Sequence, residues 1–212
     1  TLKLMKHALN CNLNKFLIGN PAYYMSGKAE IDEPGVFNFF ANIAKELKEA
    51  RIVLYSFEKL MHFKFSASLV TKLKLEFPEV YIGIKDSSGN LWDNLKLPDF
   101  SVLVGNEAKL TKNKTILGVI SATSNIQPFE IAKVYNDFKN NKLDESLNQK
   151  MINVRKAFEG HGNNLASAVH TFLSEKDERF SRLLPPLSLL ETQQKKELFS
   201  KLKELNFIPK TN

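Results

Sequence analysis

The chain has 212 residues, of which 43% are hydrophobic and 25% charged; this is enough for one sizeable core and too apolar for a disordered segment. Its formal net charge is +7, but the lysines are spread along the sequence, often beside Glu or Asp, which favours a solvated surface over a nucleic-acid-binding patch. No apolar run approaches the roughly 20 residues of a membrane-spanning helix, and no signal peptide is recognisable, so we expect a cytoplasmic protein without a membrane partner.

The cysteine and histidine content predicts neither a disulfide nor a metal site. The one cysteine, Cys11, lies on an apolar helical pattern, where we expect a packed thiol rather than a nucleophile. The four histidines show no spacing typical of zinc ligands.

The predicted elements alternate between short apolar runs and amphipathic helices, which is typical of a parallel α/β fold. Pro34 is placed near the start of one helix, and Ser66 is expected to cap another that ends before Pro78. In chain order, helices are predicted at 1–13, 36–47, 66–77 and 128–138. The intervening strands are predicted at 16–19, 52–55, 80–84, 101–104 and 116–120.

After Asn140 the pattern changes to helices alone. These are predicted at about 143–159, 163–174 and 191–205. We therefore divide the chain into an α/β region over residues 1–140 and a C-terminal helical region over residues 141–212.

Nearly every apolar run ends in a polar or reactive residue, which favours a (β/α)8 TIM barrel over an open sheet. In such barrels the chemistry lies at the carboxyl ends of the strands. No glycine-rich phosphate loop follows the first strand, as an open dinucleotide-binding sheet would more often have. Five strands cannot close an eight-stranded barrel. We therefore expect an incomplete TIM barrel (about strands 4–8), in a fragment that lacks the first strands.

Lys85 is the first candidate for chemistry, because it ends the apolar run 80–84 at the predicted barrel mouth. An amine in a partly dry pocket has a lowered pKa, and the neutral form can attack a ketone to form an imine. The alternative is a surface lysine before a serine-capped helix. From position alone the two interpretations stay open.

Two tyrosine positions suit the same strand-end edge. Tyr55 ends the run 52–54, and its phenol could pass protons to a carbinolamine or aldehyde oxygen. Tyr23 and Tyr24 follow Pro21 and could line the same mouth. Each tyrosine could instead be packing against the barrel rim or within a loop. Taken together, these two positions and Lys85, on successive strand ends, are more informative than any one of them.

Five motifs in order resemble the dihydrodipicolinate synthase / N-acetylneuraminate lyase family. The Schiff-base lysine strand of that family commonly reads G-[IV]-K-[DE]-x-[ST]-G, which is matched by Gly83–Gly89. The family's I-L-Y strand is similar to Ile52–Tyr55, and its P-x-Y-Y segment to Pro21–Tyr24. The G-x-[ED]-A and G-V-I-S-x-T-x-N motifs resemble Gly105–Ala108 and Gly118–Asn125.

The resemblance implies a homo-oligomeric barrel, tetramer or dimer, that needs no metal or organic cofactor. Lys85 would form the imine with pyruvate or another 2-keto acid. Tyr55 would relay protons, and Tyr24 is similar to the tyrosine that supports this relay across a subunit interface. Ile120 and Ser121 would line the pocket near the bound keto acid.

One departure bears on the reaction. In the family, the catalytic tyrosine is often followed by N-x-P-x-R, whose arginine holds the carboxylate of a second substrate, whereas this chain reads Ser56–Leu60. We therefore expect a lyase or aldolase acting on pyruvate or a 2-keto-3-deoxy acid. The alternatives are 4-hydroxy-tetrahydrodipicolinate synthase itself and a non-catalytic keto-acid-binding relative. The family motif that contributes a threonine to the proton relay is absent from the sequence, so we expect the chain as printed to be inactive.

Overall fold

The computed structural model describes residues 1–23, 25–87, 89, 91–160 and 165–207. The chain divides into two compact units, each with a core of its own. Residues Thr1–Asn106 and Lys112–Val119 form the first unit, and residues Glu107–Thr111 and Ile120–Asn212 form the second. Among the described residues, no helix has both the length and the apolarity needed to cross a membrane.

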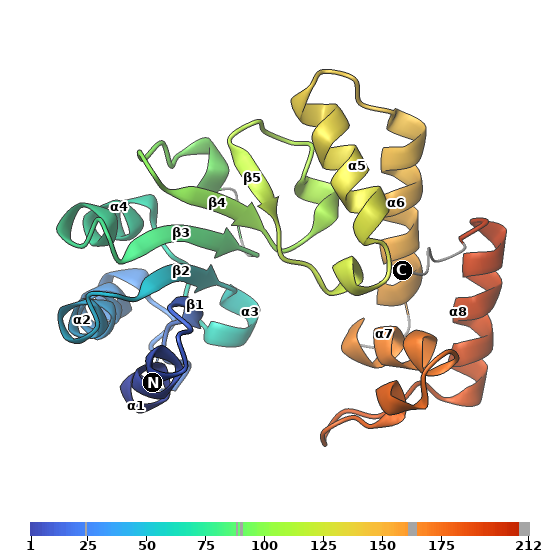
Figure 1. Cartoon of the computed structure of the whole chain (residues 1–212), viewed down its shortest axis with the longest axis horizontal. Coiled ribbons are helices and arrows are strands. Elements are labelled where there is room, and N and C mark those ends of the chain that lie inside the picture. The colour runs from blue at the N-terminus through green and yellow to red at the C-terminus, as the bar shows by residue number, and fades with distance from the viewer. Residues whose placement is uncertain (24, 88, 90, 161–164, 208–212) are drawn as a thin grey trace. The chain divides into compact units, whose positions relative to one another are not determined.

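The first unit is built on a five-stranded parallel sheet whose strands follow one another in the order β1-β2-β3-β4-β5 (Figure 1). The strands are β1 (Lys15–Gly19), β2 (Arg51–Ser56), β3 (Tyr81–Asp86), β4 (Ser101–Val104) and β5 (Ile116–Val119). The helices of this unit are α1 (Leu2–Asn10), α2 (Ala29–Glu46), α3 (Glu58–Met61) and α4 (Ala67–Glu76), with the 3-10 helix η1 (Leu91–Asp93). A sequential parallel sheet with helical crossovers confirms the predicted α/β class and matches consecutive strands of a TIM barrel.

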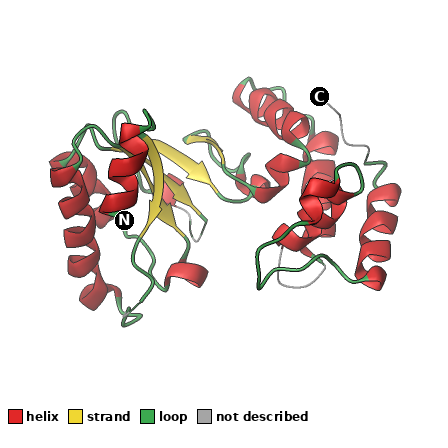
Figure 2. Cartoon of the chain, turned by 60° about the horizontal axis from the view of Figure 1, so that its bottom comes forward, coloured by secondary structure: helices red, strands yellow, loops and turns green. Residues whose placement is uncertain are grey.

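Helices α2 and α4 pack against one face of this sheet (Figure 2). Alternate strand side chains, such as Ile52, Leu54 and Ile84, are fully buried on that face. The ring of Phe40 on α2 meets Tyr81 edge-on, and the Tyr81 hydroxyl donates a 2.7 Å hydrogen bond to the Phe40 carbonyl. This contact ties the first crossover helix to the centre of the sheet.

Of two predictions about helix starts, the structure confirms one and contradicts the other. Ser66 caps α4 as predicted, because its hydroxyl accepts a 3.0 Å hydrogen bond from the Leu69 amide. The prediction that Pro34 lies near a helix start is wrong: α2 begins at Ala29, so Pro34 lies inside the helix. Pro34 therefore removes one of the first intrahelical hydrogen bonds, close to an end where several amides have no intrahelical partner anyway.

The prediction for Cys11 is also wrong. Helix α1 ends at Asn10, and Cys11 is the C-terminal cap residue with an exposed side chain. The apolar pattern of α1 buries Met5 instead.

The second unit is helical. Its elements are η2 (Glu107–Lys109), η3 (Ala122–Asn125), α5 (Pro128–Lys139), α6 (Glu145–Glu159), α7 (Leu165–Ser174), η4 (Glu178–Ser181) and α8 (Thr192–Glu204). Its core brings together side chains of η3's end, α6, α7 and α8, including Phe158, Ala168 and Leu198. The helices predicted after residue 140 are present as α6, α7 and α8. The compact units divide between Val119 and Ile120, and the domain boundary at residue 140 stays a prediction.

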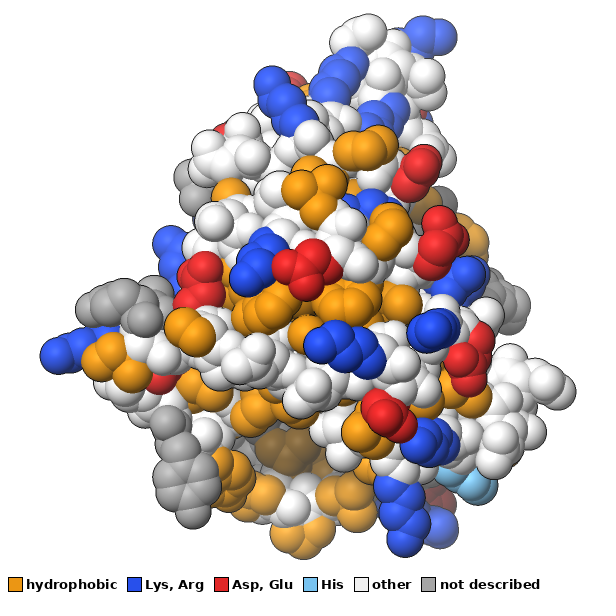
Figure 3. All heavy atoms as spheres, turned by 90° about the vertical axis from the view of Figure 1, so that its left-hand side faces the viewer, with side chains coloured by type: hydrophobic (Ala, Val, Ile, Leu, Met, Phe, Trp, Pro, Cys, Tyr) orange, Lys and Arg blue, Asp and Glu red, His pale blue; other side chains and the backbone are white. Residues whose placement is uncertain are grey.

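Charges of both signs are interspersed on the face shown in Figure 3, alongside apolar side chains. Two ion pairs lie on the surface of the first unit. Lys6 is 3.3 Å from Glu46, and Arg51 is 3.8 Å from Glu79. Such exposed pairs contribute little to stability. On this lysine-rich surface, each of them places an acidic side chain next to a basic one.

Candidate active site

The sheet register aligns five residues in one row across all five strands. They are Gly19, Tyr55, Lys85, Leu103 and Gly118. Because the strands are parallel, this row lies near the edge formed by their carboxyl ends. Tyr55 and Lys85 are the next-to-last residues of β2 and β3 and stand side by side, with a glycine at each end of the row.

The Lys85 amine lies over the Tyr55 ring, with Nζ 4.3 Å from the ring centroid. Both side chains are half-buried. Burial lowers the pKa of the Lys85 amine, which increases the share of neutral, nucleophilic amine at a given pH. Burial raises the pKa of the Tyr55 phenol, and a side-chain hydrogen bond with Ser87 opposes part of that rise. The pair therefore places an amine that could act as a nucleophile over the ring of a tyrosine whose phenol could donate a proton.

Asp86 fixes the loop that follows the lysine. Its side chain is buried, with Oδ1 accepting a 2.9 Å hydrogen bond from the Gly89 amide and Oδ2 a 3.0 Å bond from the Leu91 amide. The Ser87 amide donates a 2.8 Å hydrogen bond to the carbonyl of Ser56, the last residue of β2, so pairing between the two strands continues one residue past the end of β3. Lys85 is thus held on a rigid strand end rather than in a loose loop.

The segment after Tyr55, which lacks the proline and arginine of the family pattern, forms the four-residue helix α3. Met61 of α3 packs over Gly19, since a Cβ at Gly19 would lie 2.7 Å from Met61 Cε. Asn20 is buried beside it and donates hydrogen bonds to the Pro21 and Met61 carbonyls at 2.9 and 3.1 Å. Lys59 of α3 is exposed. Met61 therefore covers Gly19, the residue of the row that pairs with Tyr55.

The other three predicted site residues lie either outside the described residues or outside the unit that carries the pair. Tyr24 lies outside the described residues. Ile120 and Ser121 belong to the second compact unit, where the Ile120 side chain is 40% exposed. Their assignment to a keto-acid pocket, like the roles of Lys85 and Tyr55, stays a prediction.

The Ser121 hydroxyl takes part in a buried network centred on Glu107. It donates to Glu107 Oε2 at 2.6 Å and accepts a 2.9 Å hydrogen bond from Arg155. The fully buried Glu107 carboxylate also accepts from the Thr123 hydroxyl, from the Gln127 amide at 3.2 Å and from Arg155 at 2.8 Å. The Ser121 hydroxyl therefore acts both as a donor and as an acceptor within this network.

Sequence reasoning missed Arg155, which joins α6 to this network. A signal was present: Arg155 lies at helical spacing with the buried Met151 and Phe158. An arginine within an apolar helical stripe predicts a buried acidic partner. In the part of the chain that the structure describes, no group of three or more His, Cys, Asp or Glu side chains is placed to hold a metal ion.

The fold is similar to several solved structures. A dihydrodipicolinate synthase from Bacteroides thetaiotaomicron has a TM-score of 0.79 at 21% identity, over 96% of this chain and 70% of that one. A 2-keto-3-deoxygluconate aldolase from Sulfolobus in complex with D-KDPG has a TM-score of 0.81 at 17% identity, over 97% and 69%. YagE, an E. coli K12 prophage protein of the dihydrodipicolinic acid synthase family in complex with pyruvate, has a TM-score of 0.78 at 21% identity, over 98% and 71%. These likenesses confirm the fold.

A search among curated proteins gave no significant match. The model of the dihydrodipicolinate synthetase family, by contrast, matches residues 2–205. That range includes the parallel sheet, the Lys85–Tyr55 pair and the helices of the second unit. The chain therefore belongs to the dihydrodipicolinate synthetase family.

Proposed function

We propose that the protein is a Schiff-base lyase or aldolase that acts on pyruvate or another 2-keto acid. Lys85 is its covalent lysine and Tyr55 its proton relay. The observation that carries the proposal is the pair itself: Nζ of Lys85 stands 4.3 Å from the Tyr55 ring centroid on adjacent strand ends. Membership of the family supports it, as do the pyruvate and D-KDPG complexes of the similar structures.

The proposed chemistry begins with attack of the neutral Lys85 amine on the keto carbon. A carbon–nitrogen bond forms as the carbon–oxygen π bond breaks, and the proton lost by the attacking nitrogen is transferred to the keto oxygen to give a carbinolamine. The Tyr55 phenol then gives its proton to the departing hydroxyl, so that water leaves and a protonated imine remains. The imine withdraws electrons from the neighbouring carbon, which allows a carbon–carbon bond there to break or form. The Tyr55 phenolate recovers a proton in a later step.

The resemblance assigns three further residues to the site. Tyr24 supports the relay from a neighbouring subunit, which makes the protein a homo-oligomer, and Ile120 and Ser121 line the keto-acid pocket. A chain with one cysteine suits a reducing, cytoplasmic compartment.

The structure of α3 favours an aldolase for 2-keto-3-deoxy acids over 4-hydroxy-tetrahydrodipicolinate synthase. Where the family pattern has an arginine for a second carboxylate, this chain has the exposed Leu60, which lies between the exposed Lys59 and Met61. An apolar leucine in place of the arginine suits a substrate without a second carboxylate at this position.

The test is borohydride trapping on the full-length gene product with pyruvate and with 2-keto-3-deoxygluconate, read by peptide mass spectrometry. We expect a reduced adduct on the Lys85 peptide. Lys85→Ala should give no adduct, whereas Lys96→Ala, which removes an exposed lysine, should trap as wild type does. A folded protein that traps neither acid, or traps them on another lysine, contradicts the proposal.

A further inference from the structure

The segment that follows β5 carries the two residues proposed to line the keto-acid pocket, Ile120 and Ser121. It leaves the sheet two residues after Gly118, the member of the Lys85 row on β5. Ser121 caps the 3-10 helix η3, because its hydroxyl accepts a 3.3 Å hydrogen bond from the Thr123 amide. The placement of Ile120 therefore depends on how Ser121 is held.

Both oxygens of the Glu107 carboxylate are used in holding this segment. Oε2 accepts hydrogen bonds from Ser121 at 2.6 Å and from Arg155 at 2.8 Å. Oε1 accepts from the Thr123 hydroxyl and from the Gln127 amide, the latter at 3.2 Å. A carboxylate offers about four acceptor positions, two on each oxygen. The four donors therefore hold the Glu107 side chain, which has no exposed surface, in one orientation.

Arg155 joins Glu107 and Ser121 from helix α6. Its Nη1 atom lies 2.8 Å from Glu107 Oε2 and 2.9 Å from Ser121 Oγ, so one guanidinium nitrogen donates to both residues. Its Nε atom donates a 2.7 Å hydrogen bond to Glu159 on the same helix, which holds the guanidinium plane. Because the donors of a guanidinium have fixed directions, these contacts restrict the Ser121 side chain to one position.

We propose that Arg155 is a positioning residue for keto-acid binding, and that it acts through Ser121 to fix the segment Ile120–Thr123. The inference rests on the proposed function and deepens it. The guanidinium stays bonded to Glu107 and Ser121 throughout and touches no reacting atom. Without it, Ser121 keeps its bond to Glu107 but loses the second contact that fixes its side chain. A less ordered pocket wall then weakens binding of the keto acid, whereas the imine-forming step itself remains.

The test measures how the rate of borohydride trapping depends on pyruvate concentration in the full-length protein. The curve gives the apparent dissociation constant for pyruvate and the trapping rate at saturation. Circular dichroism and thermal melting establish that each variant is folded at the assay temperature. The control is Arg179→Met, because the Arg179–Asp177 pair is exposed. The other variants are Arg155→Met, Ser121→Ala, Arg155→Met/Ser121→Ala and Arg155→Met/Glu107→Gln.

We expect Arg155→Met to raise the apparent dissociation constant for pyruvate about tenfold, less than the roughly 10²-fold that a misplacement of about 1 Å can cost. The trapping rate at saturation should change little, and Arg179→Met should match wild type. Arg155→Met/Glu107→Gln should show the same increase as Arg155→Met, and it carries the test if Arg155→Met does not fold, because it leaves no unpaired buried charge.

A double-mutant cycle shows whether Arg155 acts through Ser121. If it does, the effects of Arg155→Met and Ser121→Ala on the dissociation constant are not additive. The double variant should then bind pyruvate about as weakly as the weaker-binding single variant. Additive effects would contradict the proposed route through Ser121.

A folded Arg155→Met variant with the wild-type dissociation constant overturns the inference, and so does one that loses only the saturating rate. Failure of the proposed function looks different, because the wild-type protein would then trap no keto acid. In that event hydrogen exchange still decides whether Arg155 holds the segment. Amides of residues 120–127 should exchange faster in Arg155→Met than in wild type, while those of α8 stay unchanged, and equal exchange in the segment refutes the positioning role.

Discussion

Replacing Arg155 by methionine removes the cation from the buried network of the second unit. The arginine side chain is 10% exposed and that of its partner Glu107 0% exposed. One guanidinium nitrogen, Nη1, lies 2.8 Å from Glu107 Oε2 and 2.9 Å from Ser121 Oγ, and Nε lies 2.7 Å from Glu159. Methionine keeps much of the apolar stem, so the change isolates the charge and its hydrogen bonds.

The loss of stability follows from what remains around Glu107. Removing one partner of a buried ion pair costs about 3–5 kcal/mol, because the other charge stays buried. Ser121, Thr123 and Gln127 still donate to the carboxylate, which places the cost at the lower end, about 3 kcal/mol. For a chain of this size that corresponds to a decrease in melting temperature of roughly 6–12 °C.

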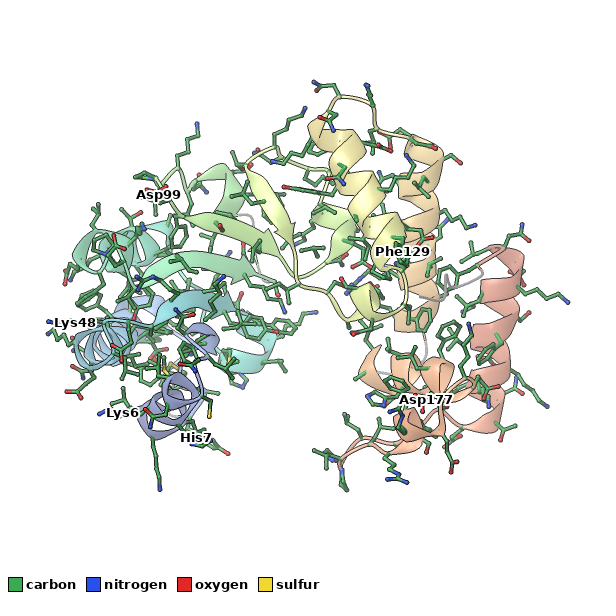
Figure 4. All side chains as sticks on the ribbon, in the orientation of Figure 1. Lys6, His7, Lys48, Asp99, Phe129 and Asp177 are labelled. Carbon is green, nitrogen blue, oxygen red and sulfur yellow. The ribbon has the colours of Figure 1, made fainter. Side chains whose placement is uncertain are left out.

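Urea unfolding followed by circular dichroism measures the free energy of unfolding. The control is Arg179→Met, since the Arg179–Asp177 pair near η4 (Asp177 is labelled in Figure 4) is solvent-exposed and should contribute little. The double variant Arg155→Met/Glu107→Gln removes both charges and should be more stable than Arg155→Met alone. If the free energy of unfolding of Arg155→Met lies within about 1 kcal/mol of the wild-type value, the loss is smaller than the cost of breaking a buried ion pair, and the reasoning about this network is wrong.

In the full-length protein, Lys85→Ala should abolish turnover, whereas Tyr55→Phe should slow it strongly and leave keto-acid binding largely intact; wild-type turnover in Lys85→Ala contradicts the mechanism. Because burial lowers the pKa of Lys85, pyruvate trapping should rise with pH to a midpoint below the ordinary lysine value of 10.5 and then level off. A midpoint at or above that value argues against a desolvated amine. Gly83→Ala would place a Cβ 2.5 Å from the Ser101 carbonyl oxygen, so urea unfolding should show a loss of about 1–3 kcal/mol. Ser66→Ala should cost about 1 kcal/mol through the lost cap of α4, and no loss refutes that role.

The elements that sequence predicts well depend on local patterns. The five strands are short apolar runs between turn residues, and each lies where the pattern predicted it within one or two residues. The neighbourhood of Tyr55 and Lys85 also follows from local information, because a helical crossover returns the chain to the adjacent parallel strand. Strand register needs more than this, and the shifts near Ile52 and Val102 had no sequence signal that we recognised.

The elements that sequence did not predict depend on contacts distant along the chain or on very short segments. Glu107, Ser121 and Arg155 come from three separate segments, and only folding shows that a strand-end glutamate is fully buried. Helix α3 has four residues, too few for a helical period to appear. Pro34 was placed near a helix start because proline is common there, yet α2 begins five residues earlier.

The strand order has a consequence for how the protein is made. Each strand of the sheet pairs with the strand synthesised just before it, so the sheet can grow from its first strand while the ribosome is still extending the chain. Tyr55 and Lys85 meet as soon as β3 joins β2, and the loop that must close spans a single crossover. The strand order therefore allows synthesis and assembly to run in the same direction, with the reactive pair able to form before α5–α8 have been translated.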